Sequence, residues 1–191
     1  MKVGLLILCL VMASLMIECS NLQEREMQQF IDHYVAEVKP LLHQAAVAYW
    51  EAATTGNEKS YSKNAELELQ IRTIHSDQEK FRRLQLLRQA GAGTDPLLLR
   101  QIEILYHAYL PNQIDTTLLR QIVEKTSAVE QKFSTFRGEM DGKKMTNNEI
   151  GQILKKETNS TNRKSAWLAG KQVGALVAAD VVELAQLRNA G

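Results

Sequence analysis

The sequence predicts an all-α protein built from long antiparallel helices. Apolar residues recur at helical spacing along almost the whole chain from Leu22 onward. Only 3 prolines and 10 glycines are spread over 191 residues, which favours long uninterrupted helices over a fold with many turns. The composition, 45% hydrophobic and 24% charged, is that of a globular domain and excludes a disordered chain. We therefore expect helical hairpins packed around an apolar core.

The first helix is expected over residues 22–54. Its apolar stripe consists of Phe30, Tyr34, Val38, Leu41, Ala45, Ala48 and Ala52. Pro40 lies within this stretch, where it lacks a backbone donor and crowds the carbonyl of Ala36, so we expect a kink or a restart there. Gly56 and Asn57 end the helix.

A second helix is expected over residues 60–90, with Leu67, Ile71, Ile74, Phe81 and Leu84 on its apolar face. The glycines of residues 91–93 break it. Two acidic caps then mark the following helices. Asp95 before Pro96 opens a third helix that ends at Pro111, and Asp115 caps a fourth that is stopped by Gly138.

The C-terminal third predicts one short β-hairpin followed by two more helices. The hairpin is expected near residues 136–146, because Asp141-Gly142 favours a type I′ turn. Thr146 and Glu149 form a capping box that opens the fifth helix, and Asn159 leads into the sixth. The apolar side of this last helix is expected to carry Trp167, Gly170, Val173, Val177, Val181, Leu184 and Leu187.

Residues 1–20 predict a signal peptide. Lys2 is followed by an apolar run from Val3 to Ile17, which is typical of a signal peptide and short of the ~20 residues that cross a bilayer. An uncleaved N-terminal anchor and a lipoprotein linked through Cys19 are the alternatives. We therefore expect an exported protein, either periplasmic, at the cell surface or extracellular, with any membrane attachment through its N-terminus.

No residue of the chain is predicted to be catalytic, cofactor-binding or metal-binding. Both cysteines lie within residues 1–20, which excludes a thiolate zinc site from the remainder. The four histidines have no ligand spacing and are interpreted as surface or cap-bonded residues: His33, His43, His75 and His107. The aromatic residues expected in the core are Tyr49, Trp50, Tyr106, Tyr109 and Trp167. The net charge is +1 and no Lys/Arg cluster stands out on a face, so no nucleic-acid partner is expected.

Three stretches nevertheless resemble one enzyme family. The first is residues 30–56, which close on Trp-Glu-Ala-Ala-Thr-Thr-Gly. The second is residues 133–150, with Phe-Ser-Thr-Phe-Arg-Gly-Glu-Met-Asp-Gly and then Asn-Asn-Glu-Ile. The third is residues 163–189, with Arg-Lys-Ser-Ala-Trp-Leu-Ala-Gly-Lys and a final Leu-Arg-Asn. In order and spacing they are similar to zinc peptidases related to angiotensin-converting enzyme, the peptidyl-dipeptidases, and to their microbial branch.

The resemblance implies a large all-helical fold in which zinc, held by H-E-x-x-H and a downstream Glu, activates a water that attacks a peptide bond. This chain has no position matching those ligands. It would therefore be the N-terminal lid and wall of the peptidase domain, residues 21–191, truncated at Gly191. The resemblance assigns zinc and a peptide substrate to the full-length parent and implies that this chain alone binds no zinc and is inactive. The alternative is a self-contained, non-catalytic helical exported binding protein.

Overall fold

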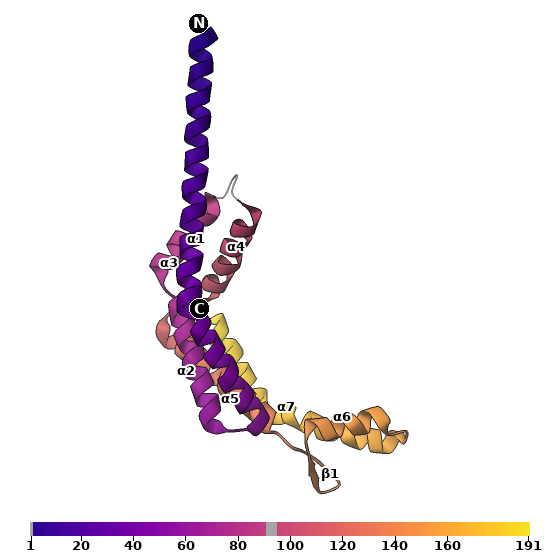
Figure 1. The fold of residues 1–191 in the computed structure, drawn as a ribbon. Coiled ribbons are helices and arrows are strands. Elements are labelled where there is room, and N and C mark those ends of the chain that lie inside the picture. Colours follow the sequence, from indigo (N-terminus) through magenta and orange to yellow (C-terminus); the bar gives the residue numbers. More distant parts are fainter. Residues whose placement is uncertain (1, 91–94) are drawn as a thin grey trace. The chain divides into compact units, whose positions relative to one another are not determined.

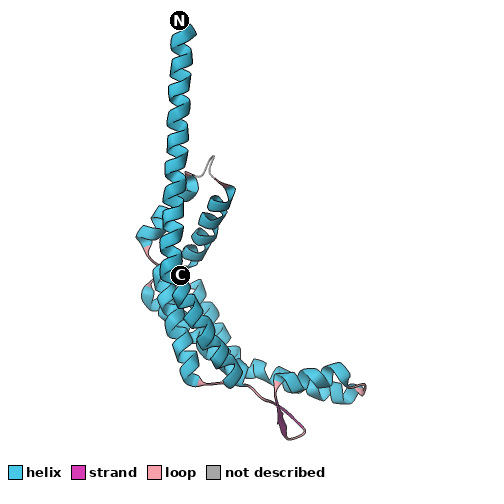
Figure 2. Cartoon of the chain, in the orientation of Figure 1, coloured by secondary structure: helices cyan, strands magenta, loops and turns pink. Residues whose placement is uncertain are grey.

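The computed structural model describes the backbone of residues 2–90 and 95–191 and the side chains of residues 22–90 and 95–191. Helices make up most of this part of the chain, and the strands that it contains form a short hairpin (Figure 1, Figure 2). The all-α prediction is confirmed. The expected break at residues 91–93 and the side chains of the apolar run 3–17 lie outside the described residues. Among the residues whose side chains are described, no helix is long and apolar enough to span a membrane.

Helix α1 (Lys2–Thr55) is longer than the sequence predicts. It begins near the start of the chain because no Pro or Gly separates residues 17 and 22. Pro40 lies inside it, so the helix does not restart there. The predicted stripe is confirmed, since Phe30, Val38, Ala45, Ala48 and Ala52 are buried and its two other members are half-buried.

The predicted second helix is in fact two helices, α2 (Glu58–His75) and α3 (Gln78–Gln89). Asp77 ends the run, because its side chain accepts hydrogen bonds from the backbone amides of Glu79 and Lys80, 2.9 Å each, and so caps α3. The prediction of one helix over 60–90 was wrong because helical periodicity continues across the cap in the sequence.

The helices that follow begin at the predicted caps. Helix α4 (Pro96–Tyr109) starts after Asp95, whose carboxylate accepts from the amide of Leu97 at 2.8 Å. The 3₁₀ turn η1 (Leu110–Asn112) follows, and α5 (Thr116–Thr135) begins one residue after Asp115.

The predicted hairpin is also confirmed. Strands β1 (Gly138–Met140) and β2 (Lys143–Met145) pair antiparallel with Met140 opposite Lys143. Asp141 and Gly142 have φ values of 52° and 76°, as a type I′ turn requires. Helices α6 (Asn147–Lys156), with the Thr146–Glu149 capping box, and α7 (Ser160–Asn189), capped by Asn159, complete the chain.

Contacts divide the chain into two compact units. The first unit comprises Met1–His43 and Gln70–Thr116, and the second comprises Gln44–Leu69 and Thr117–Gly191. In the first, α3 and α4 lie beside α1 (Figure 1), and the three helices enclose a core of large side chains. This core consists of Met27, Phe30, Ile31, Leu84, Leu87, Ile102, Leu105 and Tyr109.

In the second unit, α6 and the hairpin pack on the first half of α7. Their core is small and consists of Ile150, Ala166 and Ala169, with methionines 140 and 145 beside it. Gly138 is required here because a Cβ atom would lie 2.6 Å from the carbonyl oxygen of Ala169. Further along α7, Lys125 and Lys132 of α5 pair with Asp180.

The placement of several aromatic residues was wrong. Trp167 is 52% exposed and Trp50 is 73% exposed, and Tyr49 is exposed as well, whereas Tyr109 is buried as expected. On α7 the buried side is centred on Ala166 and Ala169, one residue away from Trp167. Two small alanines let α6 approach α7 closely, and this rotates the indole outward.

Candidate functional site

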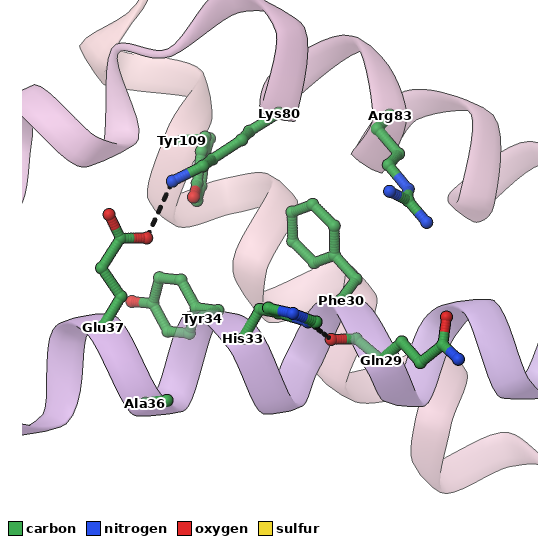
Figure 3. A pocket seen from close by; sticks show the side chains of 9 residues that line it. All are labelled: Gln29, Phe30, His33, Tyr34, Ala36, Glu37, Lys80, Arg83 and Tyr109. Atoms are coloured by element: carbon green, nitrogen blue, oxygen red, sulfur yellow. Dashed lines mark hydrogen bonds and ion pairs between the residues drawn. The ribbon is translucent and has the colours of Figure 1, made fainter.

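A groove of about 620 Å³ in the first unit is the candidate site. It lies between α1 and α3 and reaches the end of α4 (Figure 3). The residues that line it are Gln29, Phe30, His33, Tyr34, Ala36, Glu37, Lys80, Arg83 and Tyr109. Clefts that combine apolar walls with a few polar groups are the usual form of small-ligand sites.

The rim of the groove carries opposite charges. The Lys80 ammonium donates to a Glu37 carboxylate oxygen at 2.7 Å, and both side chains are substantially exposed. Figure 3 shows the Arg83 guanidinium standing apart from this pair, and it meets no carboxylate within the described residues. His33 Nδ1 lies 2.7 Å from the carbonyl oxygen of Gln29. Because a carbonyl only accepts, Nδ1 donates, and Nε2 stays available to a ligand.

Three rings form the inner part of this region. The Tyr34 hydroxyl lies 3.0 Å from Nε2 of His75, and the two rings stack with centroids 5.7 Å apart. The ring of Tyr109 lies 4.9 Å from that of His75. Gln113 Nε2 donates to the backbone oxygens of both His75 and Tyr109, at 2.7 and 3.1 Å. The cluster therefore joins α1, α2 and the end of α4 through polar contacts.

Burial sets the charge of these rings. It raises the pKa of Tyr34 and of Tyr109, and it lowers the pKa of His75, with a further contribution from the nearby Arg72 cation. All three side chains are consequently neutral near pH 7. The hydroxyl of Tyr34 and Nε2 of His75 form a hydrogen bond whose direction follows the tautomer of the ring, and only 8% of His75 is exposed.

His75 is the residue that sequence reasoning missed. The other three histidines are exposed, in line with their interpretation as surface residues, whereas His75 is buried. Its position follows from the break at Asp77, because the last turn of α2 ends beside Tyr34 of α1. The available signal was the cap, Asp77 with Glu79 two residues later, which places His75 at a helix end.

The groove offers polar groups that can bind a small ligand, but its lining residues do not form an arrangement of catalytic groups. The hydroxyl of Tyr34 is hydrogen-bonded to His75, which lies beside the groove, and the rim offers two cations, one carboxylate and one imidazole nitrogen. Across the described residues, no three His, Cys, Asp or Glu side chains converge on a point that could hold a metal ion. The described residues therefore do not fit the three or four convergent ligands of a zinc centre.

Comparison with known proteins identifies the relationship of the chain. A family model described as angiotensin-converting enzyme, a peptidase family, matches residues 21–191. No curated protein and no solved structure gives a significant match. The matched range begins one residue after the predicted signal peptide and covers all of the described side chains.

Proposed function

The chain belongs to the angiotensin-converting enzyme family, and on that premise we propose that it supplies the N-terminal lid helices and one wall of an exported, zinc-dependent peptidase. The family match over residues 21–191 carries the proposal. In this function the chain shapes the approach to a peptide-binding cleft, and the zinc ligands belong to another part of the enzyme.

Exposed apolar side chains support the role of a wall. In the second unit, α1 presents Val47, Tyr49 and Trp50 to solvent, and α7 presents Leu176, Val181 and Val182. Soluble proteins seldom leave so many large apolar side chains uncovered on helices unless further protein packs there. Each of these helices already buries one side within the unit. The exposed apolar side chains lie on the other side.

The chemistry expected of the enzyme divides between its parts. A bound zinc ion would activate the attacking water and polarise the peptide carbonyl. The contribution of this chain would be to exclude water and to position the peptide. We expect the chain alone to bind no stoichiometric zinc and to cleave no peptide.

Metal analysis and a peptidase assay of the purified chain test this division. After incubation with zinc and gel filtration, we expect no retained metal, and no hydrolysis of short peptides with or without a chelator. About one zinc per chain, removed by substitution of His33, His43 or His107, would contradict the proposal. A hydrophobic dye tests the wall itself, since the chain should bind the dye and associate as its concentration rises.

A second candidate function, a non-catalytic binding protein, is favoured by the α1–α3 groove. The unpaired Arg83 guanidinium lines a cavity of about 620 Å³, which suits a small ligand with an anionic group. A monodisperse monomer that binds no hydrophobic dye but binds small carboxylates, with the binding lost in Arg83→Gln, would favour this function over the first.

A further inference from the structure

The α6–α7 turn carries an uneven charge. Residues 155–171 contain five cationic side chains and one carboxylate, in a chain whose net charge is only +1. The cations form two groups, Lys155 and Lys156 at the end of α6, and Arg163, Lys164 and Lys171 on α7. We call these five residues, with Trp167 and Leu168, the basic hairpin patch.

The two groups belong to the two helices of one hairpin. Helices α6 and α7 pack against each other through Ile150, Ala166 and Ala169, and a short turn at residues 157–159 joins them. A shallow hollow of about 370 Å³ lies at this end of the hairpin, with Arg163, Lys164 and Trp167 on its α7 side and Leu154 on its α6 side. The two groups are separated in the sequence by residues 157–162, so the sequence alone does not show that they belong to one helical hairpin.

The cations of the patch are not neutralised internally. All five are exposed, and within the described residues none of them forms an ion pair with a carboxylate. The single acidic residue, Glu157, is used in the turn. Its carboxylate accepts from the backbone amide of Asn159 at 2.8 Å and from the Asn162 side chain at 3.2 Å. By contrast, Lys63, Lys80, Arg88, Lys125 and Lys132 each meet a carboxylate elsewhere in the structure.

Two large apolar side chains lie among these cations. Positions 163, 164, 167, 168 and 171 share one face of α7, opposite the buried Ala166 and Ala169. Trp167 is 52% exposed and Leu168 is 49% exposed. The ammonium of Lys171 lies 5.4 Å from the centroid of the Trp167 ring. This face lies opposite the side of α7 that packs on α6, so its cations, its indole and its leucine are accessible to an external partner.

We propose that the basic hairpin patch binds the surface of an anionic lipid membrane. Lysine and arginine beside a membrane attract acidic headgroups, while indole rings favour the interface between headgroups and acyl chains. The long lysine stems can lie along apolar surface and still keep their charge in water. The exposed cations on this helical face match the acidic headgroups, and the large apolar side chains match the interface between headgroups and acyl chains. This inference is independent of the proposed peptidase function.

Vesicle partitioning of the full chain tests the proposal. The probes are vesicles of phosphatidylcholine alone and of phosphatidylcholine mixed with phosphatidylglycerol. The readout is the ratio of the two partition constants, because any binding through the apolar run 3–17 contributes to both. Removal of one cation should weaken partitioning to the anionic vesicles roughly five-fold, and Lys155→Gln/Lys156→Gln/Arg163→Gln/Lys164→Gln on the order of a hundred-fold or more. The ratio for this variant should fall toward one, and that for the unmodified chain should fall with added salt.

The matched control is Lys39→Gln/Lys59→Gln/Arg82→Gln/Arg120→Gln, which removes four exposed cations elsewhere. Its ratio should stay close to that of the unmodified chain. Equal losses in the two variants, or no loss in the patch variant, would overturn the proposal. So would patch-dependent binding to polyglutamate or DNA without any preference for anionic vesicles. In a Trp50→Phe background, Trp167 fluorescence should shift to the blue with anionic vesicles, and an unshifted spectrum would also count against it.

Discussion

The α1–α3–α4 core and the α6–α7 hairpin pack helices with very different side chains. The first fills its interior with Met27, Leu84, Ile102 and Tyr109, all nearly inaccessible to solvent. The second uses Ala166 and Ala169 against Ile150, and its largest side chain, Trp167, lies outside. A core of large side chains is stabilised by the volume that each of them fills. A close contact between two helices instead requires small side chains at the point of contact. The two regions should therefore fail under opposite kinds of substitution.

Leu84→Ala should have the largest effect. Leu84 is 0% exposed inside the first core, so truncation leaves a cavity and should lower the free energy of unfolding by about 2–5 kcal/mol. Urea denaturation followed by circular dichroism measures the loss. Leu86→Ala, on the exposed side of the same helix, is the control and should change stability by less than about 0.5 kcal/mol. Similar losses in both variants would mean that the core is not where the contacts place it.

Gly138→Ala tests the opposite sensitivity. An added methyl group would lie 2.6 Å from the carbonyl oxygen of Ala169 and 2.9 Å from Ile150, so overpacking should cost about 1–3 kcal/mol. Gly174→Ala adds the same group where nothing lies within 4 Å, and it should instead stabilise α7 by about 0.5–1 kcal/mol. Thermal melting of the two variants compares them. If Gly138→Ala left the melting temperature unchanged, α7 and β1 would not be in close contact.

The buried His75 should make the first unit sensitive to acid. Its pKa in the folded state lies below the ordinary value of 6.5, because burial and Arg72 disfavour the charged ring. Above pH 6.5 neither state binds the proton. As the pH falls through 6.5 toward the lower folded pKa, only the unfolded state binds it, so the free energy of unfolding decreases. His75→Phe should weaken this dependence of the free energy of unfolding on pH. Hydrogen exchange in α3 and α4 between pH 7 and 5 measures it. The control is His43→Gln, a substitution at an exposed position, and it should leave the dependence unchanged. A slope that His75→Phe leaves unchanged would assign the effect to other groups.

Trp167→Ala should have the smallest effect on stability, less than about 1 kcal/mol, because half of the side chain is already in solvent. The burial expected from periodicity would instead require a loss of about 3–5 kcal/mol. Acrylamide quenching in a Trp50→Phe background gives an independent reading, since only Trp167 then fluoresces, and efficient quenching is expected. A strongly protected indole would reverse the assignment of faces on α7.

Part of the candidate groove could be predicted from the sequence. Phe30 and Tyr34 were on the expected apolar stripe of α1, and Tyr109 was expected in the core. His75 could not be anticipated from spacing alone. Its burial depends on a hydrogen bond to Tyr34, forty-one residues away, and on the break between α2 and α3 that Asp77 produces. Local patterns carry no information about partners at such a separation.

The sequence by itself determined where most helices begin and where the hairpin turns, because caps, Asp-Gly and helical periodicity act through neighbouring residues. Helix α5 begins beside the predicted Asp115, and α6 opens at the predicted capping box. Only the tertiary structure decided which of two adjacent apolar positions on α7 is buried. Successive residues on a helix are about 100° apart, so periodicity alone does not separate Ala166 from Trp167. The close approach of α6 admits a methyl group and excludes an indole, and the same contact makes one hairpin of the two helices that carry the cations.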